Sequence, residues 1–229
     1  MEIDKIEVNS ETGFALWAES YDHENNPLIA VEEPYIERLL RGISYSCVLD
    51  AGAGTGRYIL KLAKRGAIVT AIDNCPEMLA IAENNTHRSK FNINFHLTSL
   101  EDRLPFDADK FDLVLCTLVL THIGNLKDVT KEFHRVCKKE GYLLATDFHP
   151  DSVALGWRTE FDREGTTYLL PNMDYKRKDY LEAIQNAGFT LLQIIDVPTR
   201  EVPQGYLSEG IIDSYGDVNL CLIILGQKQ

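Results

Sequence analysis

The sequence predicts an α/β protein with a mostly parallel β-sheet. Short apolar runs of strand length alternate along the chain with segments whose apolar residues recur at helical spacing. The first run leads directly into a turn that carries Gly52, Gly54 and Gly56, and helical spacing resumes at Tyr58. The 229 residues, 45% of them hydrophobic, are enough for one well-packed domain, so we expect a single domain over residues 1–229.

The composition limits the kinds of partner. The chain has 23 Lys and Arg against 35 Asp and Glu, a formal net charge of −12, and no basic cluster. Such a surface repels a phosphate backbone, so we expect a small-molecule substrate and no nucleic acid. The longest apolar run, residues 220–225, has the length of a strand and not of a membrane span. We therefore expect a cytoplasmic monomer or homodimer without a membrane partner. The five cysteines are scattered without a C-x-x-C pair, which indicates reduced packing residues and no metal site.

The expected elements follow from the same periodicities. Apolar runs predict strands at residues 48–49, 67–72, 93–97, 111–116, 142–148, 189–195 and 219–225. Helical spacing predicts helices at residues 58–63, 77–84, 129–138 and 179–187. The last strand is reached by a loop and not by a crossover helix, so we expect it to be antiparallel to its neighbours.

Two further segments lie outside this alternation. Residues 1–45 carry apolar residues at helical spacing, with Pro34 near an expected helix start, and predict an N-terminal helical cap. In residues 151–178, two β-prone stretches, 157–161 and 166–170, flank a turn that contains Gly165 and predict a hairpin.

The glycine turn indicates a ligand site. Glycines let the backbone turn tightly and let a ligand approach where a Cβ would clash, and the first turn of the following helix offers unpaired N–H groups. The spacing is not the dinucleotide fingerprint, because that pattern requires glycine at position 57, which is Arg57. It is not a P-loop either, since no Gly-Lys-Ser/Thr follows. A small polar ligand is the expected occupant.

Asp73 ends the second expected strand. The carboxyl ends of neighbouring parallel strands face one crevice, so its carboxylate should lie beside the glycine turn, where it can accept hydrogen bonds from both hydroxyls of a ribose. The alternative is that Asp73 caps the next helix, although Asn74 and Pro76 are better placed for that role.

The string Asp50-x-Gly52-x-Gly54-x-Gly56 resembles motif I of the class I S-adenosylmethionine-dependent methyltransferases. Four other strings are similar to this family: Trp17-Ala-x-x-Tyr21-Asp22, Leu104-Pro105-Phe106, Phe111-Asp112-x-Val114 and Lys139-Glu140-Gly141. The resemblance runs from about Trp17 to the end and is strongest from Val48 to Phe148. It implies a Rossmann-like three-layer sandwich whose seven-stranded sheet has the strand order 3-2-1-4-5-7-6. It also implies that the insertion at residues 151–178 lies over the active site as a lid. The implied cofactor is S-adenosylmethionine, and the implied product is S-adenosylhomocysteine.

The resemblance also implies which residues bind the cofactor. In the family the glycine loop lies against the methionine part, and an N-terminal piece closes over it. The residues expected to bind the cofactor are Tyr21, Asp50, Gly52, Ala53, Gly54, Gly56, Asp73, Asn74, Ser99, Leu100 and Thr117. Ser99 stands where the family has an adenine-binding Asp, so Glu101 or Asp102 could substitute or the contact could be weaker, and recognition by the Leu100 backbone is expected.

Two histidines are candidates for a catalytic base. His122 follows the fourth strand and His149 follows the fifth, and an imidazole with an intrinsic pKa near 6.5 suits proton transfer at neutral pH. The alternatives are that His122 only orients its loop and that His149 is a solvated turn residue. On the cap and the insertion, the residues expected to contact substrate are Trp17, Trp157, Arg158 and Tyr168.

Three readings of the function remain at this point. The first is methyl transfer to a small molecule. The others are a dinucleotide-dependent oxidoreductase and a cofactor-binding regulator without activity. No Asn-Pro-Pro-Tyr string follows the fourth strand, which argues against amide or adenine N-methylation, and an oxygen, nitrogen or carbon acceptor stays open.

Overall fold

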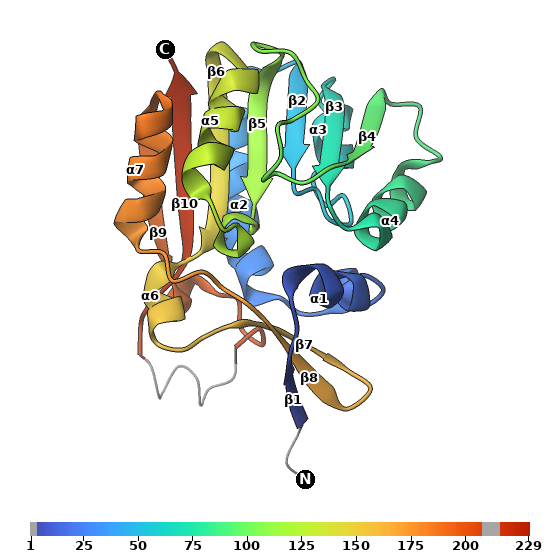
Figure 1. The fold of residues 1–229 in the computed structure, drawn as a ribbon, viewed down its shortest axis with the longest axis vertical. Coiled ribbons are helices and arrows are strands. Elements are labelled where there is room, and N and C mark those ends of the chain that lie inside the picture. Colours follow the sequence, from blue (N-terminus) through green and yellow to red (C-terminus); the bar gives the residue numbers. More distant parts are fainter. Residues whose placement is uncertain (1–3, 208–215) are drawn as a thin grey trace.

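The computed structural model describes residues 4–207 and 216–229 (Figure 1). The helices are α1 (Ser10–Trp17), α2 (Pro27–Arg41), α3 (Ile59–Lys64), α4 (Pro76–Thr86), α5 (Leu126–Val136), α6 (Pro150–Ala154) and α7 (Arg177–Ala187). The strands are β1 (Asp4–Glu7), β2 (Cys47–Ala51), β3 (Ile68–Asp73), β4 (Ile93–Leu97), β5 (Phe111–Thr117), β6 (Cys137–Phe148), β7 (Thr159–Arg163), β8 (Thr166–Leu170), β9 (Phe189–Pro198) and β10 (Asn219–Lys228). No helix within these two ranges is long and apolar enough to cross a membrane.

The main sheet has the predicted topology. Within the described residues it contains seven strands in the order β4-β3-β2-β5-β6-β10-β9. Strand β10 is antiparallel to both β6 and β9, and the other pairs are parallel. The predicted order 3-2-1-4-5-7-6 and the antiparallel last strand are therefore confirmed.

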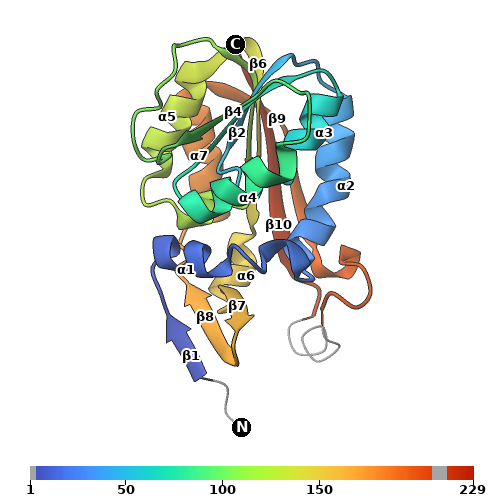
Figure 2. The same cartoon turned by 90° about the vertical axis from the view of Figure 1, so that its right-hand side faces the viewer.

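Helices cover both faces of this sheet, with α2 and α3 on one side and α5 and α7 on the other (Figure 2). Each face has its own apolar layer: Ile36 and Leu62 belong to one, Phe133 and Ile184 to the other, and all four are fully buried. Central strands covered on both faces are apolar where helices pack on both sides, which is why residues 113–116 of β5 form a continuous hydrophobic run.

A second, smaller sheet lies beside α1, on the side of the main sheet where β2 and β3 have their carboxyl ends (Figures 1 and 2). In the described part of the chain it has three strands in the order β1-β8-β7. The antiparallel pair β7 and β8 is the predicted hairpin. The first residues of the chain were expected to be helical, but β1 is a strand that pairs in parallel with β8.

Several helix boundaries also differ from the prediction by one to three residues, and the start of α2 and the end of α5 have identifiable causes. Helix α2 begins at Pro27 because the Asn26 side chain accepts hydrogen bonds from the next backbone N–H groups, and Pro34 lies inside the helix instead of near its start. Helix α5 ends at Val136, two residues early, because β6 begins at Cys137.

Candidate functional site

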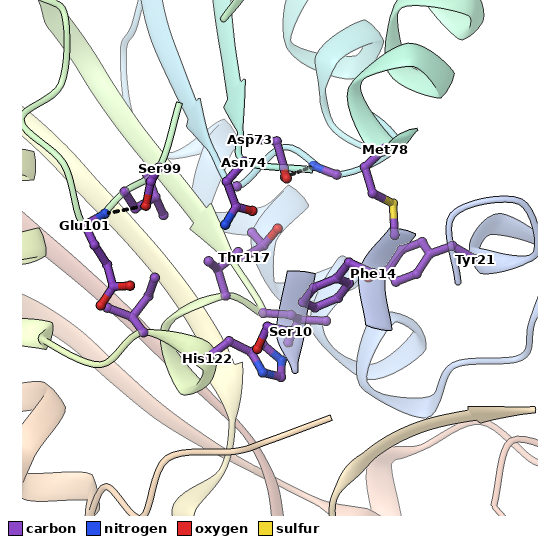
Figure 3. A pocket seen from close by; sticks show the side chains of 16 residues that line it. Ser10, Phe14, Tyr21, Asp73, Asn74, Met78, Ser99, Glu101, Thr117 and His122 are labelled. Atoms are coloured by element: carbon purple, nitrogen blue, oxygen red, sulfur yellow. Dashed lines mark hydrogen bonds between the residues drawn. The ribbon is translucent and has the colours of Figure 1, made fainter. Parts of the chain in front are cut away.

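A cavity of about 270 Å³ lies at the carboxyl ends of β2, β3, β4 and β5 (Figure 3). The described residues that line it are Ser10, Phe14, Tyr21, Gly52, Gly54, Asp73, Asn74, Met78, Ser99, Leu100, Glu101, Thr117, Leu118, Val119, His122 and Ile123. Most of the predicted cofactor residues are therefore brought together. Asp50, Ala53 and Gly56 lie outside this set.

The three motif glycines have positive φ angles, and each leaves different space around it. A Cβ on Gly52 would lie 2.4 Å from Cγ2 of Val119, and one on Gly56 would lie 3.0 Å from Cβ of Ala82, so these two positions allow close packing of the turn. Gly54 lines the cavity with a φ of +54°, and its Cβ would meet no described atom within 4 Å. A side chain there would occupy space that a ligand can use.

Asp73 holds this turn in place. Its Oδ2 accepts a hydrogen bond from the Gly54 N–H at 2.8 Å, and its Oδ1 accepts one from the Cys75 N–H at 2.9 Å, at the start of α4. Helix α4 has no side-chain cap, so Asp73 braces the glycine turn and the residue before the helix without capping it. Each carboxylate oxygen retains a further acceptor site, so the side chain can still bind a ligand hydroxyl. Burial raises the pKa of Asp73, and the backbone donors oppose that shift.

Two buried acidic residues, Asp50 and Glu32, lie near Arg57, which directly follows the glycine turn. Asp50 is buried, and its Oδ2 has no hydrogen-bond partner among the described residues. Burial raises the pKa of Asp50 to about 7, the nearby Arg57 guanidinium lowers it, and the Asp73 carboxylate raises it further. Arg57 forms a 2.5 Å ion pair with Glu32, which is fully buried in α2 and accepts a hydrogen bond from the Thr146 hydroxyl. Nothing in the sequence pattern indicated Glu32.

The N-terminal segment is joined directly to the glycine turn. The Thr55 hydroxyl donates a hydrogen bond to Asp22 Oδ1 at 2.6 Å. Tyr21 lines the cavity, and its ring lies edge-on to Trp17 at 4.9 Å. Ser10 and Phe14 of α1 also line the cavity and were not among the predicted residues. The apolar spacing of Phe14 and Trp17 was the available signal for Phe14.

At the far end of the cavity, Ser99, Leu100 and Glu101 follow β4. The Ser99 hydroxyl accepts a hydrogen bond from the Glu101 N–H at 3.1 Å, and Glu101 Oε1 accepts one from the Gly124 N–H at 2.9 Å. Of the two acidic residues considered as substitutes for the family's Asp, Glu101 lines the cavity, whereas Asp102 is outside the described lining.

His122 lines the same cavity with one ring nitrogen fixed. Its Nδ1 lies 2.7 Å from the carbonyl oxygen of Pro171, so Nδ1 carries the proton and donates, and Nε2 is an acceptor. Burial lowers the pKa of His122 to about 4, against a smaller opposite effect of the Pro171 carbonyl. The imidazole is therefore neutral at physiological pH.

His149 does not face the crevice, which corrects the expectation for this residue. It is fully buried, and its Nε2 lies 3.0 Å from Asp196 Oδ1. Its Nδ1 accepts a hydrogen bond from the Asp151 N–H, so His149 caps the start of α6. Since both ring nitrogens are engaged away from the cavity, His149 has a structural role.

The predicted substrate residues are divided among different places. Trp17 is buried, stacks on Phe161 at 5.0 Å and lines a small cavity next to His122. Trp157 and Arg158 line an outer cavity of about 580 Å³, between the N-terminal segment and the insertion. Tyr168 stacks on Phe161 within the small sheet and lines neither cavity. Only Trp17 is thus brought close to the candidate base.

Known proteins share this domain. The family model described as a methyltransferase domain matches residues 49–145. The demethylmenaquinone methyltransferase of Tropheryma whipplei is 34% identical over 161 residues, which cover 68% of this chain and 64% of that protein. The ubiquinone biosynthesis O-methyltransferase of Coxiella burnetii is 33% identical over 143 residues, which cover 62% of this chain and 59% of that protein. The chain thus spans about three fifths of the length of these relatives.

Solved structures have the same fold. The S-adenosylmethionine-dependent methyltransferase of Mesorhizobium loti matches with a TM-score of 0.67 at 18% identity, over 87% of this chain and 98% of that one. One from Methanosarcina mazei matches with a TM-score of 0.64 at 20% identity, over 83% and 96%.

The fold and the site are those of a class I, Rossmann-like methyltransferase: a sheet of this order, with a glycine turn and an acidic residue at the carboxyl ends of its first two parallel strands. With the domain match, the chain belongs to the class I S-adenosylmethionine-dependent methyltransferase family, and the resemblance seen in its motifs is confirmed.

Proposed function

We propose that this protein transfers a methyl group from S-adenosylmethionine to a small-molecule acceptor and releases S-adenosylhomocysteine. The observation that carries the proposal is the cavity in which Gly54 leaves open space beside the carboxylate of Asp73. The two relatives named above are methyltransferases of quinone biosynthesis by their names, which supports a small acceptor.

The donor set of the cavity fits this cofactor. Asp73 has acceptor sites left for the ribose hydroxyls, and Ser99 and Leu100 lie where the adenine is expected. S-adenosylmethionine carries a sulfonium and an ammonium group, and the carboxylate of Asp73, which lines the cavity, favours cationic groups at this end of the sheet. When bound, the cofactor supplies the electrophilic methyl group and the leaving group.

The protein's own contribution is alignment, exclusion of water and the handling of one proton. His122 is fixed by the Pro171 carbonyl, so its Nε2 can accept a hydrogen bond from an O–H or N–H of the acceptor. With a pKa of about 4 it is a weak base. We therefore propose that His122 orients the acceptor and takes its proton only during the reaction.

Binding of S-adenosylhomocysteine and NAD, measured side by side by calorimetry, tests the proposal against the oxidoreductase alternative. We expect S-adenosylhomocysteine to bind and NAD not to bind, and the reverse result would refute the proposal.

Transfer of a labelled methyl group from S-adenosylmethionine into a fractionated metabolite extract tests the proposal against the alternative that the protein is a cofactor-binding regulator without activity. We expect a labelled small molecule and slower labelling by His122→Ala at unchanged cofactor affinity. Cofactor binding without any labelled product would favour the regulator.

We also propose that residues 1–229 act as a single methyltransferase domain, in which residues 1–45 and 151–178 cover the site. No nucleic acid or membrane partner is proposed, and a monomer or homodimer is expected. The cytoplasmic location stays a prediction from the sequence.

A further inference from the structure

Leu118 has an unusual backbone conformation at the point where β5 ends. Its φ is +59°, in the left-handed region. The other described non-glycine residues with positive φ are Asp109, Glu140 and Glu164, and all three are charged and exposed. This conformation strains every residue except glycine, and a bulky residue there is a clear outlier. Among the described residues, Leu118 is therefore the bulky apolar residue whose backbone carries this strain.

The neighbouring contacts hold Leu118 in this conformation. Its N–H donates a hydrogen bond to the Thr146 carbonyl at 2.9 Å. The next residue, Val119, packs against the glycine turn, since a Cβ on Gly52 would lie 2.4 Å from Val119 Cγ2. The Val119 carbonyl in turn accepts a hydrogen bond from the His122 N–H at 2.9 Å. Strain persists where such contacts over-determine the backbone, and it is concentrated at ligand sites.

Packing in the core does not explain why a leucine stands at this position. Leu118 is only partly buried, and it belongs to none of the three apolar clusters formed by the described residues. Its neighbours Val119 and Leu120 both pack into one of these clusters. A glycine would adopt the same conformation without strain. The leucine therefore indicates that the side chain has a function outside the core.

The position of Leu118 between two cavities supplies that function. It lines the cofactor cavity and also a second cavity of about 30 Å³, which has room for a water molecule or one small functional group. Phe14, Tyr21 and His122 line both cavities as well, so these four residues form a shared wall. The imidazole of His122 is neutral, so no residue of this wall is charged. Such a wall selects ligand groups by size and shape and not by charge.

We propose that Leu118 is a specificity-determining residue. Its side chain is the partition between the bound cofactor and the second cavity, and it limits the size of the acceptor group that approaches the transferable methyl group. The reacting end of the acceptor is then an uncharged O–H or N–H group on a compact carbon skeleton, which passes Leu118 and reaches His122. This inference rests on the proposed function, because it requires a bound cofactor and an acceptor.

The first test asks whether the side chain faces the cofactor. In Leu118→Cys, the new thiol is modified with methyl methanethiosulfonate and counted by mass spectrometry. The native cysteines are buried or half-buried, and wild-type protein gives their background. Saturating S-adenosylhomocysteine should slow modification of the new thiol at least about tenfold. Leu155→Cys, at an exposed position outside both cavity linings, is the control and should react equally with and without S-adenosylhomocysteine.

The second test separates the side chain from the strain. Leu118→Ala and Leu118→Gly both remove the partition, but only glycine also relieves the strain, so Leu118→Gly should melt about 2–4 °C above Leu118→Ala. Methyl transfer from labelled S-adenosylmethionine into the fractionated metabolite extract should nevertheless change alike in both variants. We expect the proportions of labelled products to shift at least about tenfold towards bulkier compounds. If Leu118 only shaped its turn, Leu118→Gly would give the wild-type products.

Two results would overturn the inference: equal modification of Leu118→Cys with and without S-adenosylhomocysteine, or wild-type product proportions from Leu118→Gly. The two tests use different variants, so poor folding of one leaves the other decisive, and the first needs no acceptor. Failure of wild-type protein to bind S-adenosylhomocysteine, or to methylate any compound of the extract, would instead refute the proposed function, which separates the two failures.

Discussion

The open space at Gly54 leads to a sharp prediction for Gly54→Ala. Gly54 has a φ of +54°, where an L-residue costs about 1–2 kcal/mol. For a chain of this size, each kcal/mol lowers the melting temperature by about 2–4 °C, so we expect a decrease of about 2–8 °C. Because the new methyl group would lie in the cofactor cavity, we also expect the affinity for S-adenosylhomocysteine to fall at least about tenfold, or about 1.4 kcal/mol.

Gly66 is the matched control. It lies in the exposed turn after α3 with a φ of +90°, and its Cβ would also meet no described atom within 4 Å, but it is far from the cavity lining. Gly66→Ala should therefore cost a similar amount of stability and leave the affinity unchanged. Calorimetric titration with S-adenosylhomocysteine and thermal melts without ligand measure the two effects. Equal affinities of Gly54→Ala and Gly66→Ala would refute the assignment of Gly54 to the cofactor site.

Three further substitutions test the surrounding charges. Asp73→Asn replaces a carboxylate oxygen, which accepts a backbone hydrogen bond, by an amide nitrogen. Calorimetry should therefore show about tenfold weaker S-adenosylhomocysteine binding, and urea unfolding should show a free energy of unfolding lower by about 1–3 kcal/mol. Glu32→Gln leaves the Arg57 cation buried without its counter-charge, so the free energy of unfolding should fall by about 3–5 kcal/mol. An unchanged midpoint of urea unfolding would contradict this expectation. His122 has a pKa lowered to about 4, so its contribution to stability is complete above pH 6.5 and is lost as the pH falls towards 4. Wild-type protein should lose about 2 kcal/mol more than His122→Gln between pH 7.5 and pH 5 in urea unfolding, and equal losses would contradict the neutral state of His122.

The sequence could predict the main sheet and the centre of the site because their signals are local. Strands covered on both faces need continuous apolar runs, as in β5, and a tight strand-to-helix turn needs glycine at positive φ, as at Gly52 and Gly54. Asp73 could be placed because parallel strands end at one edge. These rules act on neighbouring residues, so a single sequence contains them.

The parts that could not be predicted depend on partners far along the chain. Strand β1 contains charged residues at Asp4, Lys5 and Glu7, and it forms because β8, about 160 residues later, offers a free edge. Asp147 and His149 show the same limit. Both lie near the end of β6, but the strand ends between them, so the acid lines a cavity while the histidine caps α6.

The small sheet ties the beginning of the chain to a segment far along it. Strand β1 pairs with β8, and the guanidinium of Arg163 on β7 donates a hydrogen bond to the Leu16 carbonyl of α1 at 2.6 Å. The residues that contribute Phe14 and Tyr21 to both cavities are therefore attached to residues 159–170 as one body. Any displacement that admits or releases a ligand on this side has to carry the N-terminal segment along, and loss of β1 would leave the hairpin attached to this segment through Arg163 and Leu16.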